Sequence, residues 1–173
     1  MADVIKYKSK EISLRKVKRD VTKINSNEQS IELRNDTPSL VLIKKEIGEE
    51  KLIALLQLLI IDVIEFFNVK ETMKDEHIEQ TAMWILQDFK DIHLNELMFV
   101  FEQAKKGRYG EMYNLINGTK IYNWFENYWE YRLEYFENKH IATSGDRDPY
   151  ERSSSTEEIA KIERQIKLGR KKK

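Results

Sequence analysis

The sequence predicts an all-α protein, a small bundle of about four to five helices with flexible basic arms at both ends. Apolar residues recur at three- and four-residue steps through the middle of the chain, which is the period of an amphipathic helix. Six Gly and two Pro among 173 residues are too few for a turn-rich β architecture. With 35% charged and 40% hydrophobic residues, the composition is typical of one globular domain with a single core.

The first segment, residues 1–36, is predicted to be a basic arm that is disordered or partly helical. Its first 25 residues carry eight bases and three acids, and the single apolar residues between them keep no sustained period. Residues 46–102 have the opposite balance, with 13 acids and four bases. Such an arm can contact nucleic acid, fold back onto the acidic body, or keep the chain soluble. The bases expected to touch DNA are Arg15, Lys16, Lys18 and Arg19.

Residues 37–141 are predicted to form the helical domain. Thr37 and Pro38 have the order of an N-cap and a first-turn proline, which predicts a short helix over residues 38–46. Gly48 is expected to end this helix, because glycine accepts the backbone conformations that terminate one.

Three longer helices are predicted after that. The first, residues 49–67, is expected to be the most buried and to end at Asn68. Its apolar run is shorter than the ~20 residues of a membrane span and includes charges, so we expect a core helix. Residues 74–90 and 95–106 each show one apolar stripe, and Gly107 stands where the second of them should stop.

The last helix of the domain, from Thr119 to about residue 139, carries an aromatic residue on nearly every side. A helix this apolar all round must be buried on more than one face, by the domain or by a partner. Acids outnumber bases along it, which disfavours contact with a phosphate backbone. The pattern therefore favours a core or a protein interface over stacking on nucleic acid.

The turn at residues 105–110 (KKGRYG) combines three bases and an aromatic residue in a segment held by two glycines. It can hold a phosphate or a partner carboxylate. It can also be a simple helix end, with the bases placed for the helix dipole and Tyr109 against Tyr113. The side chains expected to bind a partner in the domain are Lys105, Lys106, Arg108, Tyr109, Tyr113 and Trp124.

Beyond residue 141 the composition changes. Residues 142–155 read as a flexible linker rich in Ser and charge. Residues 156–173 are predicted to form a short amphipathic basic helix, opened by a capping box between Ser155 and Glu158. A helix this short is marginal alone and would become firm on a partner. The expected partner contacts are Ile159, Ile162 and Ile166, and the expected DNA contacts are Arg170, Lys171, Lys172 and Lys173.

Motifs of catalysis and of metal binding are missing from the sequence. No nucleotide-binding loop or hydrolase motif occurs. His77, His93 and His140 are far apart and form no HExxH motif or i, i+4 pair, so no metal site is expected. Paired carboxylates lie on helix faces opposite the apolar stripes, as on a solvated surface. We therefore expect a protein that is not an enzyme and needs no cofactor.

The sequence also indicates a location. It has no Cys, which fits a reducing compartment. Its first residues alternate charged and apolar positions and lack the apolar segment of a secretory signal. The cytoplasm is the expected location, and no membrane partner is expected.

Over residues 37–141, the order of features resembles a family of small helical proteins encoded by phages and mobile elements of gut-type bacteria. The resemblance lies in Thr37-Pro38, Gly48, residues 66–69 (FFNV), residues 77–82 (HIEQTA), and above all residues 104–113 (AKKGRYGEMY) ahead of Trp124-Phe125. Some members of the family look like replication accessory proteins that load a hexameric helicase. The resemblance implies a similar role here and assigns no catalytic residue.

Charge pattern and resemblance together predict an adaptor in DNA replication of a phage or mobile element. It would bind a hexameric helicase or another replisome protein through the helical domain, and DNA weakly through the basic arms, in the cytoplasm of a bacterial host. The alternative is a virion-associated structural or cargo protein whose arms contact packaged DNA or the shell. A DNA-reading regulator needs a helix with bases on its exposed face, and none of the helices predicted within residues 37–141 has one.

Overall fold

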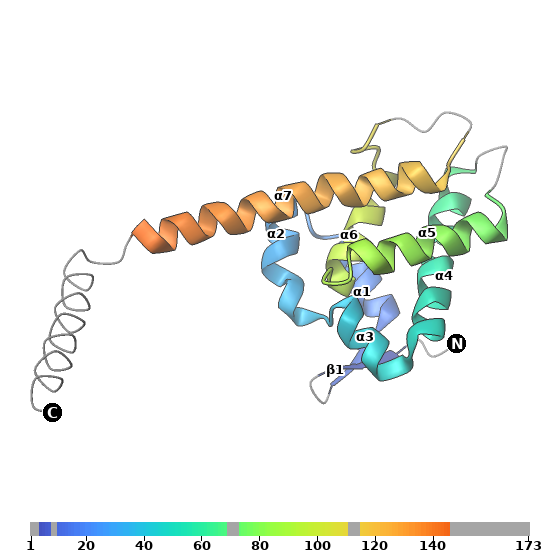
Figure 1. The fold of residues 1–173 in the computed structure, drawn as a ribbon, viewed down its shortest axis with the longest axis horizontal. Coiled ribbons are helices and arrows are strands. Elements are labelled where there is room, and N and C mark those ends of the chain that lie inside the picture. The colour runs from blue at the N-terminus through green and yellow to red at the C-terminus, as the bar shows by residue number, and fades with distance from the viewer. Residues whose placement is uncertain (1–3, 8–9, 69–72, 111–114, 146–173) are drawn as a thin grey trace, which may run out of the picture. The chain divides into compact units, whose positions relative to one another are not determined.

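The computed structural model describes residues 4–7, 10–68, 73–110 and 115–145, and this part of the chain is mostly helical (Figure 1). In chain order its elements are strands β1 (Val4–Tyr7) and β2 (Lys10–Ser13), helices α1 (Leu14–Val21) and α2 (Asn27–Glu32), the 3-10 helix η1 (Leu33–Asp36), and helices α3 (Leu40–Ile47), α4 (Glu49–Phe67), α5 (Asp75–Asp88), α6 (Leu94–Lys105) and α7 (Gly118–Gly145). The chain divides into two units, Met1–Leu133 and Glu134–Lys173, so that α7 begins in the first and ends in the second. The predicted helical fold is confirmed in its main part. The described residues, however, form seven α-helices rather than four or five, and a two-stranded antiparallel sheet in addition.

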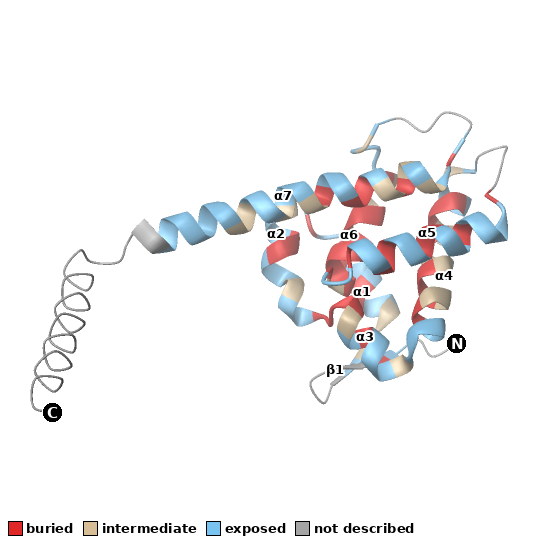
Figure 2. Cartoon of the chain, in the orientation of Figure 1, coloured by how far each residue is buried: buried red, intermediate tan, exposed pale blue. Residues whose placement is uncertain are grey.

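Helix α6 is the centre of the first unit. Ten of its 12 residues are buried, because α1, α2, η1 and α4 all pack against it (Figure 2). The sequence predicts residues 49–67 as the most buried helix, and this is wrong. Helix α4 keeps charged residues such as Glu50 and Glu65 on an exposed face, whereas α6 is covered on every side.

The N-terminal segment belongs to the first unit and is not a free arm. Val17 and Val21 of α1 are buried, as are Ile24 and Ile31, and α1 and α2 both pack on α6. A flexible arm, disordered or partly helical, was expected over residues 1–36; the described part of that range is helical in places, as one alternative had it, but it is packed and not flexible. The apolar residues of α1 do follow a helical spacing, but this helix has only eight residues. So short a helix repeats the helical period too few times for the period to be recognised in the sequence.

The segment around Thr37 also differs from the prediction. Helix α3 begins at Leu40, with Ser39 as its N-cap, so Pro38 lies outside the first turn. Residues 38–41 instead pair with the chain entering α6: Leu94 N donates to Pro38 O at 2.9 Å, and Leu40 N donates to Ile92 O at 3.0 Å. This pairing holds Thr37 against the start of α6.

The predicted ends of the other helices agree with the structure within a few residues, except for α7. Gly48, at φ 88°, separates α3 from α4, and Asn68 closes α4 in the left-handed conformation at φ 47°. Gly107 follows α6 at φ 74°, with its N donating to Ala104 O at 2.9 Å. Helix α7 extends to Gly145, into the range predicted to be a linker. None of the described helices combines the length and apolarity needed to cross a membrane.

Candidate nucleic-acid interface

Asp62 joins two basic regions that are far apart in the sequence. This residue of α4 accepts a hydrogen bond from Lys18 Nζ of α1 at 2.6 Å and another from Lys105 Nζ of α6 at 2.5 Å. Partial burial pushes the pKa of Asp62 upward, but the hydrogen bonds and charges of Lys105 and Lys18 outweigh it, so the pKa lies below its ordinary value. Asp62 thus stays ionised and ties α1 to the end of α6.

Helix α1 presents bases to solvent from a fixed position. Val17 and Val21 mark its buried face, and residues about 140–180° around the helix from the centre of that face point outward. Arg15 and Arg19 occupy those outward positions and are exposed. The expectation that none of the helices within residues 37–141 carries such bases did not consider α1, because residues 14–21 were assigned to an arm.

The turn after α6 adds bases beside the Asp62 junction. Lys106 and Arg108 are exposed, and Lys106 pairs with Glu102 one helical turn back at 3.8 Å, a distance at which an exposed pair contributes little. Lys105, in contrast, is largely covered, with only 12% of its side chain exposed, because Asp62 holds it. We call the four exposed bases that α1 and the turn after α6 contribute the basic face: Arg15, Arg19, Lys106 and Arg108.

An exposed aromatic ring lies next to the junction. Phe66, one helical turn after Asp62 on α4, is 58% exposed. Lys105 Nζ lies 5.3 Å from the centre of its ring, within range of a cation–π interaction. An exposed aromatic side chain beside basic side chains is typical of surfaces on which the nucleobases of a single strand stack.

Two side chains that the sequence assigns to partner binding instead contribute to the core. Trp124 is only 2% exposed, and Tyr109 stacks on it with ring centres 6.3 Å apart and planes 16° apart. Burial raises the pKa of the Tyr109 hydroxyl. Tyr109 therefore anchors the turn onto α7, as a helix end with a packed tyrosine would require. The predicted contact of Tyr109 with Tyr113 lies outside the described residues.

Other predicted contacts lie outside the described residues. These are Tyr113, Ile159, Ile162, Ile166, Arg170, Lys171, Lys172 and Lys173. Of the four bases predicted to touch DNA in the N-terminal segment, Lys18 is engaged by Asp62 and Lys16 lies on another side of α1.

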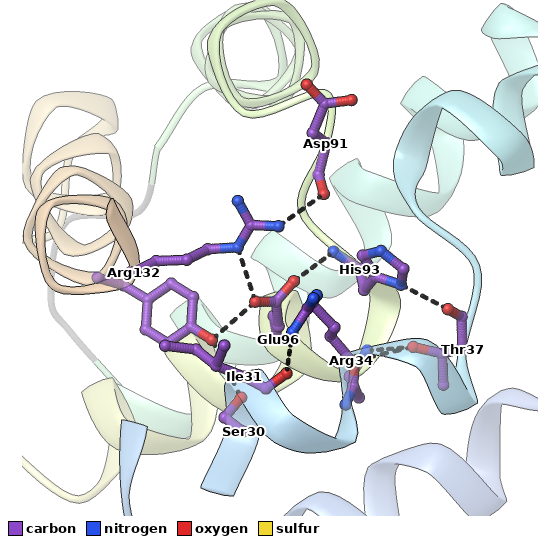
Figure 3. Close-up of polar contacts among 10 residues, drawn as sticks. Ser30, Ile31, Arg34, Thr37, Asp91, His93, Glu96 and Arg132 are labelled. Carbon is purple, nitrogen blue, oxygen red and sulfur yellow. Dashed lines mark hydrogen bonds and ion pairs between the residues drawn. The ribbon is translucent and has the colours of Figure 1, made fainter. Parts of the chain in front are cut away.

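A buried polar network, which the sequence does not indicate, fixes the start of α6 (Figure 3). Glu96 is completely buried, and its carboxylate accepts from Arg132 Nε at 2.9 Å, from Tyr128 Oη at 3.1 Å and from His93 N at 2.9 Å. Arg132 also donates to Asp91 O at 3.4 Å. Because each carboxylate oxygen has a donor, the network reads as a structural link between α6 and α7.

Metal ligands do not gather in the described part of the chain, where no group of three or more His, Cys, Asp or Glu residues could hold an ion. His93 is occupied in the fold, since its Nδ1 lies 2.6 Å from Thr37 O, a distance at which the ring donates to the carbonyl.

Comparisons with profiles of protein families, with curated proteins and with solved structures gave no significant match. The resemblance to phage and mobile-element proteins thus stays an expectation. The fold and the site define a class only: a mostly helical protein in which Asp62 links Lys18 of α1 to Lys105 at the end of α6.

Replacing Asp62 by Asn keeps the shape of the side chain and removes its charge. We expect the thermal midpoint to fall by about 1–3 °C near neutral pH, because the two ammonium groups lose their shared counter-charge in a partly solvated site. Because the pKa of Asp62 in the folded state lies below its ordinary value of 3.8, the ionised carboxylate stabilises the fold at pH values above 3.8. This contribution is lost as the pH falls through the pKa of the folded state. Thermal unfolding followed by circular dichroism should therefore show the two proteins converging as the pH falls below 3.8 and through the pKa of the folded state. A difference that persists there would mean that the charge of Asp62 is not its cause.

Proposed function

We propose that this chain is a non-enzymatic accessory protein of DNA replication that contacts nucleic acid through the basic face. The observation that carries the proposal is the shared carboxylate of Asp62, which ties Lys18 of α1 to Lys105 at the end of α6, directly before the basic turn. Fixed bases attract a phosphate backbone without regard to sequence, and the expected affinity is weak and dependent on salt. The wider role, that of an adaptor which loads a helicase or binds another replisome protein in a phage or mobile element, is supported by the resemblance alone.

The basic face offers a direct test through Arg19, Lys106 and Arg108, which are all exposed. Changing all three to Gln should lower the affinity for a labelled DNA duplex at least about tenfold at low salt. The slope of log K against log salt should become shallower by about 2–3, because each lost phosphate contact removes about 0.9 from it. Fluorescence anisotropy with the duplex and with its separate strands measures both quantities.

A matched control removes the same charge elsewhere. Lys51, Lys74 and Lys90 are exposed, and Lys51 lies eleven residues before Asp62 on α4, about 16 Å along the helix. The triple change of these residues to Gln should leave the salt slope within about 0.5 of the parent value. If the control loses as much affinity as the test variant, net charge and not the basic face governs binding. If the parent protein binds neither duplex nor single strands, the proposed function is wrong.

A further inference from the structure

A cavity of about 380 Å³ opens between β2, α1 and η1, on another side of α1 from the Asp62 junction. Lys16 lines this cavity, whereas Lys18 faces Asp62, and the two residues lie about 200° apart around the helix. The apolar part of its wall is formed by Ile12, Val17, Val21, Ile24 and Leu33. A cavity of this size with a partly apolar wall is within the range of natural ligand sites.

Asn95 supplies a polar group to the cavity wall. Its side chain comes from the first turn of α6, and the residue is only 5% exposed. The Oδ1 atom accepts from Thr37 Oγ1 at 2.8 Å, and the backbone N of Asn95 donates to the same hydroxyl at 3.1 Å. No group among the described residues accepts a hydrogen bond from the Nδ2 atom. Every buried side-chain nitrogen and oxygen in the described part of the chain has a hydrogen-bond partner, so Nδ2, which has none there, keeps some contact with solvent. Because Asn95 lines the cavity, this amide is positioned to donate to an acceptor that enters it.

The charged residues around the cavity determine which sign of ligand charge is favoured. Glu11, Asp20 and Asp36 line it together with one base, Lys16, an excess of two negative charges. Asp20 also lies 3.5 Å from Lys23, but both side chains are more than half exposed, and such a pair is weak. An anion such as a phosphate or a nucleic acid is therefore repelled, and a cationic group is attracted.

We propose that this cavity binds a short basic segment of a protein partner. An apolar side chain of that segment fills the cavity, a backbone carbonyl accepts from Asn95 Nδ2, and flanking Lys or Arg side chains lie against Asp20 and Asp36. A peptide combines these three features in a few residues. Every residue carries a backbone carbonyl, and apolar and basic side chains can follow one another in any order. The site is independent of the basic face and takes a ligand of opposite charge.

The ¹⁵N-labelled full chain tests the proposal by titration with capped peptides that have a central Leu, Ile, Val or Phe between Lys or Arg residues. A matched pool has Glu or Asp in place of the bases. The basic pool should shift the side-chain amide resonances of Asn95 in a saturable manner, and the acidic pool should not. If the basic pool leaves these resonances unmoved, or if both pools shift them equally, the proposal is wrong.

Substitutions of the two acids at the rim of the cavity, Asp20 and Asp36, distinguish binding at this site from a general effect of net charge. The double change Asp20→Asn and Asp36→Asn alters exposed side chains and should weaken binding of the basic pool about five- to tenfold. The control, Glu46→Gln with Glu79→Gln, removes the same charge from exposed positions on α3 and α5 and should change the affinity less than about twofold. Equal weakening by both variants would overturn the assignment of the rim acids.

Discussion

Ile31→Asp is expected to destabilise the first unit by about 3–5 kcal/mol, a large part of the stability of a domain of this size. Ile31 lies on α2, is completely buried, and belongs to an element that packs on α6. An aspartate there leaves a carboxylate among apolar side chains and removes the burial of an isoleucine. Urea unfolding followed by circular dichroism measures the change. The prediction tests whether the N-terminal segment is part of the fold, because a substitution in a free arm would leave the unfolding curve unchanged.

Leu33→Asp is the matched control, since it makes the same kind of change two residues further on. Leu33 is 39% exposed, so an aspartate at this position reaches water and should cost no more than about 1 kcal/mol. Similar losses from both substitutions would contradict the burial of Ile31. A stable Ile31→Asp protein would show that α2 is not held against α6 in solution.

Arg132→Leu should cost about 3–5 kcal/mol, because it leaves the buried carboxylate of Glu96 without its counter-charge. Only 12% of the Arg132 side chain is exposed, and none of Glu96. The substitution also removes the contact of the guanidinium with the Trp129 ring, 4.5 Å away, which contributes a further ~0.5–1 kcal/mol. Thermal and urea unfolding measure the loss, and Arg108→Leu on the exposed turn serves as the control with little effect expected.

A double variant decides whether the unpaired charge is the cause. Glu96→Gln carries no charge, and its one side-chain oxygen can still accept from His93 N while its amide nitrogen donates to Tyr128 Oη. Added to Arg132→Leu, it should recover at least about 1 kcal/mol, since the buried charge is gone. If the double variant is less stable than Arg132→Leu alone, the carboxylate serves mainly as a hydrogen-bond acceptor.

Local signals in the sequence predicted the helix ends well, and the reason is that a few residues decide them. Gly48, Asn68 and Gly107 each adopt a positive φ at the end of a helix, which glycine and asparagine accept at low cost. The amphipathic period likewise located α5 and α6 within two residues, because each is long enough to repeat it.

The candidate site was predicted only in part. Arg19, Lys106 and Arg108 could be named as bases, yet no pattern indicated that α1 and the end of α6 are linked. That depends on Asp62, which in the sequence is one charge in an acidic stretch. Trp124 was assigned to a partner because an aromatic helix does not reveal which of its sides the domain covers. The cavity beside Asn95 also lies between segments that are distant in the chain.

By itself, the sequence determined the helical class, the helix ends and the residues able to carry positive charge, since these depend on neighbours within a few positions. Only the tertiary structure decided that α1 and α2 belong to the core, that α6 is its centre, and that Glu96 is buried with Arg132. Those outcomes depend on contacts between residues more than 30 positions apart, such as the 44 that separate Lys18 from Asp62. Packing, unlike helix propensity, is settled by which surfaces meet once the chain has folded.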